Sequence, residues 1–370
     1  MKRPRVLFVS HVLDGSGAPR SLLHLLEHFP GREKFEFRVL GLRRTDLVEE
    51  FGAVAEKVEV ITPSPPGSLP AKGFERLRSL PRLFSRLREA RPDLVFVNSA
   101  ANSRVILLSR LLGYRVWVFV HEFDDGFVFL PKLRRKALRL AEKVFVTNRL
   151  QLRWLREEVG YSGPVRIVPN IVVAPSQRVP PPRVFLDFRG RFPFLAATMG
   201  FFSRIKGWDL LLRIAETLRG DPGVGFAMIG DFPREDEKEA FLQGLKGRGL
   251  AERFFFTGLV KSVWPYLSAA DCVLITSRSE TFSRVALEAM SCGVPVVAFE
   301  VGSLREVFPP GYPFLVPPFD CKLFAAKILE VRNLSREELS SMRAAFAGHV
   351  RRFSPERVAP LFAKEFEELL

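Results

Sequence analysis

Two glutamates, Glu280 and Glu288, stand beside the start of a predicted helix and are the acidic residues best placed to do chemistry. A buried strand is predicted to end near Thr276, and a polar loop, 277–283, leads into a helix that stops near Gly293. Backbone N–H groups at such a helix start, together with the helix dipole, form a site for an anion. The glutamates could then accept hydrogen bonds from sugar hydroxyls at the two ends of a bound diphosphate. In isolation, Glu280 could equally cap the helix and Glu288 could be a solvated acid. The amides expected to face the anion belong to Thr281, Phe282, Ser283 and Arg284.

A lysine, Lys206, precedes a second predicted helix that follows the first strand of the second half. Its ammonium group can contact a diphosphate as a mobile point charge, although a lysine there can also be simply solvated. A cation at this place would stabilise the negative charge that develops on a leaving diphosphate, which is a transition-state effect. Gly230 ends the next strand in a glycine turn and is expected to lie close to the molecule that carries this diphosphate.

In the first half, a glycine-rich loop containing Gly15 and Gly17 lies between a strand and a helix. It lacks the third glycine of a dinucleotide-binding motif, and no acidic residue ends the second strand, so binding of a dehydrogenase cofactor is poorly supported. His121 ends another strand, where it could face a ligand or be a hydrogen-bonded structural residue. Asn98 and Ser99 also end a strand and are candidates for an acceptor pocket.

The elements that must position these residues are short apolar runs that alternate with helical patterns. Most runs are almost continuously apolar, which is typical of strands covered on both faces by helices. Strand–helix alternation predicts parallel sheets built from βαβ units. The predicted strands are 6–10, 37–40, 58–61, 94–98, 116–120, 143–147 and 165–168, and then 194–199, 225–229, 254–258, 271–276, 295–299 and 314–316.

A proline-rich break over 174–182 separates the two series, because it can continue neither a helix nor a central strand. We therefore predict an α/β protein of two Rossmann-like, doubly wound domains that face a central cleft, where ligands of open α/β sheets bind. The domains are expected over 1–176 and 194–351, with a linker over 177–193. The tail is amphipathic, and Val358, Leu361, Phe362 and Phe366 are expected to share its apolar face.

The segment from Glu280 to Glu288 resembles the glutamate–seven residues–glutamate signature of family-4 retaining glycosyltransferases, which have the two-domain GT-B fold. The neighbouring residues Glu288-Ala289-Met290 and 292–297 (Cys-Gly-Val-Pro-Val-Val) match as well. The resemblance extends from Val6 to about Val316, and the tail, about 352–370, resembles the helix that crosses back onto the first domain. It implies transfer of a sugar from a nucleotide-diphosphate sugar to an acceptor, which is a glycan, a lipid or a small molecule.

The resemblance also implies roles for single residues. In such enzymes the first glutamate contacts hydroxyls of the transferred sugar, and the second contacts the nucleotide ribose. The resemblance assigns the first role to Glu280 and the second to Glu288. Lys206 would bind the donor diphosphate. The expected catalytic residues are His121, Glu280 and Lys206, with His121 catalytic or positioning beside the donor sugar.

The glycine loop with Gly15 and Gly17 corresponds to one that approaches the donor phosphates and sugar in the family. Two departures from the family pattern concern the donor. Thr281 stands where the family usually has glycine, and Phe201 stands where it commonly has arginine. Arg204 is expected to supply the missing positive charge.

Composition limits the alternatives. Lys and Arg number 56 and Asp and Glu 41, and the resulting net charge of +15 favours anionic partners. Three distant cysteines form no CxxC pair, which argues against a disulfide framework or a zinc knuckle. There is no Asp-x-Asp pair or histidine cluster for a metal, so we expect no metal and no cofactor beyond the donor substrate. One alternative to a glycosyltransferase is a nucleotide-sugar epimerase or a phosphorylase of the same fold. Nucleic-acid binding is the weaker alternative, because the sequence has no recognised basic-aromatic module for it.

The amino-terminal run is interrupted by His11 and Asp14, which favours a first strand over a signal peptide. No segment is long and apolar enough to span a bilayer. We therefore expect a cytoplasmic protein, with peripheral contact to the inner face of an anionic membrane left open. The basic segment from Phe74 to Arg88 could make that contact, or could be a domain helix with its apolar face in the core and a bend at Pro81.

Overall fold

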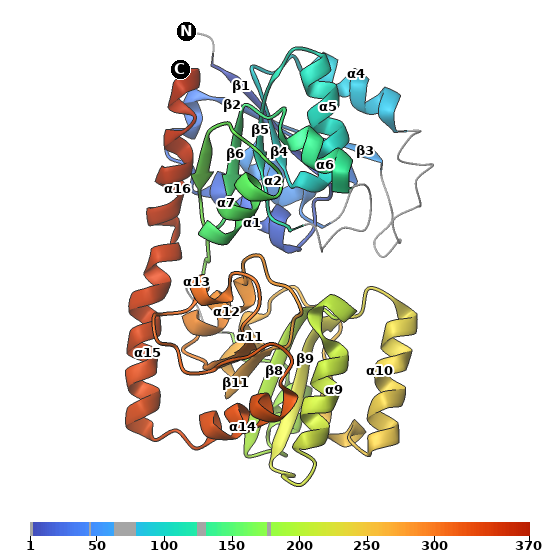
Figure 1. Ribbon diagram of the computed structural model, residues 1–370, viewed down its shortest axis with the longest axis vertical. Helices are drawn as coiled ribbons and strands as arrows, with labels where there is room; N and C mark the ends of the chain where they lie inside the picture. Colours follow the sequence, from blue (N-terminus) through green and yellow to red (C-terminus); the bar gives the residue numbers. More distant parts are fainter. Residues whose placement is uncertain (1–2, 44–45, 63–78, 124–130, 176–178) are drawn as a thin grey trace. The chain divides into compact units, whose positions relative to one another are not determined.

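A computed structural model describes residues 3–43, 46–62, 79–123, 131–175 and 179–370. The chain forms two compact units: Met1–Ile171 with Phe353–Leu370, and Val172–Arg352 (Figure 1). The sequence placed the division after residue 176 and a linker over 177–193. In the structure the second unit already begins at Val172. The expected linker contains a helix, α8 (Arg183–Arg189), which buries Phe185 and Phe188.

The first unit is built on a seven-stranded parallel sheet in the order β3-β2-β1-β4-β5-β6-β7. All seven predicted strands of this half are present. The strands are β1 (Arg5–Ser10), β2 (Glu36–Arg43), β3 (Lys57–Thr62), β4 (Leu94–Asn98), β5 (Arg115–Phe119), β6 (Lys143–Val146) and β7 (Val165–Ile167). The helices are α1 (Gly17–Glu27), α2 (Val48–Val54), α4 (Leu80–Ala90), α5 (Ser103–Leu111), α6 (Pro131–Leu138), α7 (Arg149–Glu157) and α16 (Pro355–Lys364).

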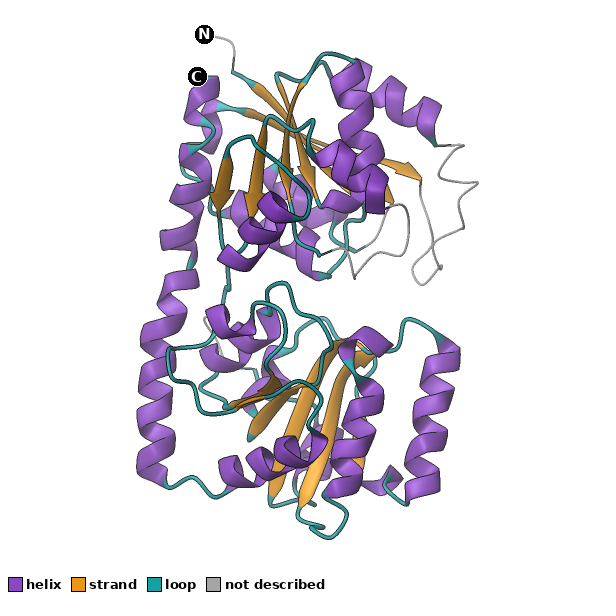
Figure 2. Cartoon of the chain, viewed as in Figure 1, coloured by secondary structure: helices purple, strands orange, loops and turns teal. Residues whose placement is uncertain are grey.

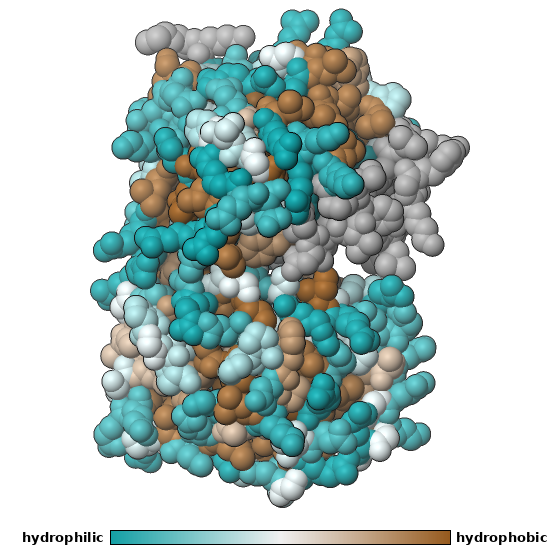
Figure 3. All heavy atoms as spheres, viewed as in Figure 1, coloured by the Kyte–Doolittle hydropathy of each residue, from teal (hydrophilic) through white to brown (hydrophobic). Residues whose placement is uncertain are grey.

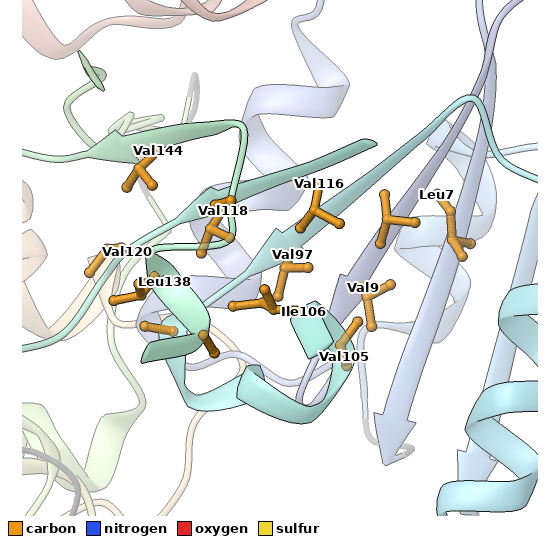
Figure 4. Close-up of a cluster of buried hydrophobic side chains, with 14 of the residues drawn as sticks. Leu7, Val9, Val97, Val105, Ile106, Val116, Val118, Val120, Leu138 and Val144 are labelled. Carbon is orange, nitrogen blue, oxygen red and sulfur yellow. The ribbon is translucent and has the colours of Figure 1, made fainter. Parts of the chain in front are cut away.

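The two faces of this sheet have different cores, because successive residues of a strand point to opposite sides. One face is aliphatic: Leu7 and Val9 of β1 and Val97 of β4 pack with Val105 and Ile106 of α5 (Figure 4). The other face is aromatic. On it, Phe8 of β1 and Phe96 of β4 contact Phe366, with ring centroids 6.1 and 5.9 Å away.

The tail returns to the first unit. Phe362 and Phe366 are fully buried, and Lys143 at the start of β6 forms ion pairs of 2.7 and 2.8 Å with Glu365 and Glu368. Leu361, which we expected on the buried face, is 55% exposed. That expectation was wrong, because the helix presents its neighbours Val358 and Phe362 to the sheet.

The second unit has a six-stranded parallel sheet in the order β10-β9-β8-β11-β12-β13, with helices on both sides (Figure 2). Its strands are β8 (Phe194–Phe201), β9 (Val224–Asp231), β10 (Phe254–Phe256), β11 (Cys272–Ile275), β12 (Val296–Phe299) and β13 (Leu315–Val316). Its further helices are α9 (Trp208–Thr217), α10 (Glu235–Arg248), α11 (Trp264–Ser268), α12 (Arg284–Ser291), α13 (Leu304–Val307), α14 (Cys321–Arg332) and α15 (Arg336–Val350). The two doubly wound sheets confirm the predicted fold class.

The basic segment around α4 is described only from residue 79, so Phe74 and Leu77 lie outside the described residues. Within α4, Leu83, Leu87 and Ala90 are buried, which is the domain-helix interpretation. Pro81 lies in the first turn, where no hydrogen bond is lost, and does not bend the helix. Figure 3 shows hydrophilic side chains over most of the visible surface, as helices with one buried face predict.

Both sheets reverse their strand order at one place, between β1 and β4 in the first unit and between β8 and β11 in the second. Loops that leave two such strands diverge to opposite faces of the sheet and leave a crevice at their carboxyl ends, which is where ligands of this fold bind. Most candidate residues follow these same strands, whereas His121 follows β5 and Gly230 lies near the end of β9.

Candidate active site

In the second unit, the reversal point joins Lys206 to Glu280. The Lys206 Nζ donates to Glu280 Oε1 at 2.7 Å, and Ser277 Oγ donates to the same oxygen at 2.7 Å. Glu280 is only 6% exposed, whereas the Lys206 side chain is 39% exposed. The carboxylate is therefore held by two donors at the sheet edge, and the ammonium group keeps a face toward solvent that an anion can approach.

The loop carrying Lys206 is fixed to the end of β11. Gly207 has φ +72°, and a Cβ there would lie 2.0 Å from the carbonyl oxygen of Thr276, so only glycine allows this approach. Arg278 donates from both Nη atoms to Asp209 at 2.7 Å, and this hydrogen bonding raises the pKa of Arg278. The Arg278 backbone N–H also donates to Ile205 at 2.7 Å. The two loops therefore form one rigid body beneath the lysine.

A third loop supports Glu280 from below. Gly302 has φ +55°, and a Cβ there would lie 1.9 Å from the Glu280 carbonyl oxygen. The Ser303 N–H donates to that oxygen at 3.0 Å, and Ser303 Oγ donates to the carbonyl of Thr281.

Helix α12 begins at the predicted residue. Ser283 is its N-cap, and Ser283 Oγ accepts from the Ala286 N–H at 3.4 Å. Glu288 is about 9% exposed and pairs with Arg284 at 2.9 Å, so it is not the solvated surface acid that an isolated glutamate suggests. Thr281 and Phe282 lie in the loop directly before this cap.

Glycines bring the ends of β8 and β9 close together. Gly230 has φ +130°, a Cβ on it would lie 2.1 Å from the carbonyl oxygen of Gly200, and its N–H donates to Thr257 Oγ1 at 3.1 Å. Phe201, the last residue of β8, is 45% exposed, and Arg204 beyond the strand is exposed as well. Arg204 thus offers a cation near Lys206, in the same short helix, Arg204–Lys206.

In the first unit, Asn98 at the end of β4 contacts His121, which follows the neighbouring strand β5. The Asn98 Oδ1 lies 2.8 Å from His121 Nε2, and Asn98 Nδ2 donates to the carbonyl of Ala18 at 3.1 Å. Asn98 and Ser99 are fully buried, so they can reach a ligand only by orienting more exposed neighbours such as His121.

The glycine loop meets this group at its Ala18 end. Helix α1 begins at Gly17, and a Cβ at Gly17 would meet no atom within 4 Å. The nearest atom to a Cβ at Gly15 would be Arg20 Nη2, at 3.4 Å. Since the folded unit leaves room at both positions, the small residues keep space open above the sheet edge.

Sequence reasoning missed a buried acid beside His121. Glu122 accepts hydrogen bonds from Ser99 Oγ and, at 3.3 Å, from the His121 N–H. Burial raises the pKa of the Glu122 carboxyl. Ser99 has φ +93°, a conformation that non-glycine residues rarely adopt, and its Oγ donates to Glu122 while it accepts from the Ala101 N–H at 3.1 Å. A His-Glu pair at a strand end was the available signal.

His11, just after β1, is a titratable residue to which the sequence pattern gave no role. Burial lowers the pKa of His11 to about 4, against a smaller raising effect of Asp14, and Nδ1 is a buried atom without a hydrogen-bond partner among the described residues. The unfolded chain therefore binds this proton more readily than the folded one between about pH 6.5 and pH 4. The stability that the neutral imidazole contributes is complete above pH 6.5 and is lost as the pH falls toward 4.

We expect His11→Gln to reduce the loss of stability between pH 7 and pH 5, because the glutamine takes up no proton. Urea unfolding of both proteins at the two pH values measures this difference. His28→Gln, at an exposed histidine of the same unit, is the matched control. An equal pH response in the wild type and in His11→Gln would contradict the assignment.

Among the described residues, no group of three or more His, Cys, Asp or Glu side chains is arranged to hold a metal ion. No helix in the described part of the chain is long and apolar enough to cross a membrane.

Comparison with known proteins supports the resemblance seen in the sequence. Residues 16–171 match the family described as glycosyl transferase 4-like domain, and residues 194–333 match the family of glycosyl transferases group 1. The 2-deoxystreptamine N-acetyl-D-glucosaminyltransferase of Streptomyces fradiae is 35% identical over 258 residues, 62% of this chain and 60% of the relative. A D-inositol 3-phosphate glycosyltransferase of Segniliparus rotundus is 33% identical over 178 residues, 45% of this chain and 38% of the relative. The chain thus spans less than two thirds of both relatives.

A solved structure extends the likeness to the whole fold. The Anabaena protein HepE, in complex with UDP and glucose, has a TM-score of 0.81 at 20% identity and covers 99% of this chain and 100% of its own. The two family matches together cover most of the chain, one in each structural unit. The chain therefore belongs to the family-4-type glycosyltransferases of the two-domain GT-B fold.

Proposed function

We propose that this chain transfers a sugar from a nucleotide-diphosphate sugar to a hydroxyl group of an acceptor, with retention of configuration and without a metal ion. The observation that carries the proposal is the contact between Lys206 and Glu280 at the reversal point of the second sheet, 2.7 Å between Nζ and Oε1. It sets a partly exposed ammonium group beside a buried carboxylate, a combination suited to a diphosphate and the sugar attached to it.

In this proposal the bond between the anomeric carbon and the diphosphate oxygen breaks while the acceptor oxygen forms a bond to the same face of that carbon. The acceptor proton passes to the leaving diphosphate oxygen. Lys206 and Arg204 stabilise the charge on the diphosphate, Glu280 holds sugar hydroxyls and Glu288 holds the ribose. His121, oriented by Asn98, positions the donor sugar.

Relatives suggest which substrates to test first. HepE is known in complex with UDP-glucose, so UDP-glucose and UDP-N-acetylglucosamine are the first donors to test. The first acceptors are 2-deoxystreptamine and D-inositol 3-phosphate, after which the two relatives are named. Glycan and lipid acceptors follow if these fail.

We expect one donor class to raise the melting temperature of the full chain in a panel of UDP-, GDP- and ADP-sugars, because a bound donor stabilises only the folded state. At a concentration of about 100 Kd the rise is roughly 5–10 °C. Glu288→Ala is expected to abolish it, while Lys327→Ala, which removes a lysine–glutamate pair on α14, should leave it intact.

The transfer itself is then measured as release of nucleoside diphosphate that depends on the acceptor, with and without a chelator. The anomeric configuration of the product is assigned by NMR. Donor epimerisation without an acceptor would favour an epimerase, and the absence of any response to every donor would contradict the proposal.

A further inference from the structure

A hollow of about 550 Å³ lies near the amino ends of the strands of the first sheet. Asn98 and His121 lie at the carboxyl ends. It is lined by Arg5, Arg38, Ser85, Arg88, Glu89 and Arg91, which come from β1, β2 and the carboxyl end of α4. Arg5 begins β1 and Ser10 ends it, so the length of the strand, about 17 Å at roughly 3.3 Å per residue, separates the hollow from the residues proposed for catalysis.

The arginines of this hollow outnumber the carboxylates that could neutralise them. Arg5 and Arg38 share one acid, Glu36, whose Oε1 lies 2.9 Å from Arg5 Nε and 2.6 Å from an Arg38 Nη atom. Glu89 accepts from Ser85 at 2.6 Å and pairs with Arg86 at 3.0 Å, both on its own helix. Glu89 therefore already has partners on its own helix and does not neutralise the two remaining arginines of the hollow.

The two remaining arginines are Arg88 and Arg91. Both are exposed, and in the part of the chain that the structure describes neither forms an ion pair. Arg5 Nη1 donates to the carbonyls of Ala90 and Arg91, which fixes the end of α4 against the sheet. The hollow thus presents two unneutralised guanidinium groups on a backbone that is held in place.

The backbone at Arg91 is unusual. Arg91 lies at the carboxyl end of α4 with φ +44°, where glycine is the residue that adopts this conformation without strain. Among the described residues, eleven glycines have positive φ, but only three non-glycine residues do: Arg91, Ser99 and Phe319. Ser99 lies beside Glu122 in the candidate active site. A side chain retained at such a position carries a conformational cost, which a functional guanidinium group would offset.

We infer that this hollow binds a phosphate group, as a second anion site separate from the proposed donor site. Guanidinium groups match phosphate oxygens through paired hydrogen bonds, and a fixed cluster of them selects phosphate over a single carboxylate. The phosphate belongs either to a soluble molecule or to a lipid headgroup, and the inference does not depend on the proposed transfer reaction.

The test uses pyrophosphate binding to the full chain by calorimetry in a Lys206→Ala background, which weakens the proposed donor site. We expect binding to persist in that background and to fall roughly ten-fold with Arg88→Ala and again with Arg91→Gly, because each removes a charge-assisted contact. Arg82→Ala, at an exposed arginine of the same helix that does not line the hollow, is the matched control. Arg91→Gly should also leave the melting temperature unchanged or higher, since glycine relieves the backbone strain.

A second arm distinguishes the source of the phosphate. Sedimentation with phosphatidylcholine vesicles that contain phosphatidic acid, dependent on Arg88 and Arg91 and absent with phosphatidylcholine alone, identifies a lipid headgroup. Pyrophosphate binding without vesicle binding identifies a soluble ligand. The inference is overturned if neither probe binds in the Lys206→Ala background, or if Arg91→Gly binds as tightly as Arg82→Ala.

Discussion

Lys206→Ala is expected to lower kcat/KM for sugar transfer by about 10²–10³-fold, because it removes a cation aimed at the charge on the leaving diphosphate. The loss should reside mainly in kcat, since that charge develops only as the bond to the sugar breaks. The Lys206 Nζ also donates to Glu280 Oε1 at 2.7 Å, so the variant frees a carboxylate that holds the sugar. Steady-state kinetics with the donor identified by thermal shift measures both effects.

Loss of stability is the smaller part of this result. The Lys206 side chain is 39% exposed, so water screens its attraction to Glu280, and Ser277 remains as a donor to the carboxylate. Lys327→Ala is the matched control, because Lys327 also lies 2.7 Å from a glutamate but on α14. If the two variants retained the same activity, Lys206 would have no part in the reaction.

Gly302→Ala is expected to lower activity by about 10²-fold although it changes no residue proposed to touch the substrate. A Cβ at this position would lie 1.9 Å from the Glu280 carbonyl oxygen, so one of the two loops must move. Displacement of a catalytic group by about 1 Å is enough for a loss of this size. The positive φ of Gly302 adds strain for alanine.

Gly247→Ala provides the comparison. Gly247 lies within α10, and a Cβ there would meet nothing within 4 Å, so alanine should leave activity unchanged and stabilise the helix by about 0.5–1 kcal/mol. Activity assays and melting temperatures of both variants measure the contrast. Full activity in Gly302→Ala would show that the position of Glu280 does not limit the reaction.

The sequence left open whether the basic segment around α4 contacts an anionic membrane with its apolar face. Its apolar residues Leu83 and Leu87 pack against the sheet, whereas Arg82, Arg86 and Arg88 are exposed. The hollow that includes Arg88 and Arg91 provides a defined surface on which contact with an acidic headgroup can be tested.

The sequence by itself determined the kind of fold and the chemistry of the donor site. Buried parallel strands leave apolar runs between helices, so all thirteen strands could be predicted, and α12 begins at the predicted residue, Arg284. Local signals also end elements correctly, as at Gly293, which takes the left-handed conformation expected after a helix. Local signals failed where burial decides, as for Leu361 and for the helix α8 inside the expected linker.

Only the tertiary structure decided which distant residues meet. Lys206 and Glu280 are 74 positions apart, and they touch because β8 and β11 are neighbours in the sheet although two strands separate them in the chain. Ser99 and Glu122 likewise meet because β4 and β5 are neighbours in the sheet, and the four arginines of the hollow come from β1, β2 and α4. Periodicity and composition report how each segment faces solvent or core, but strand order and loop packing set the contacts between segments.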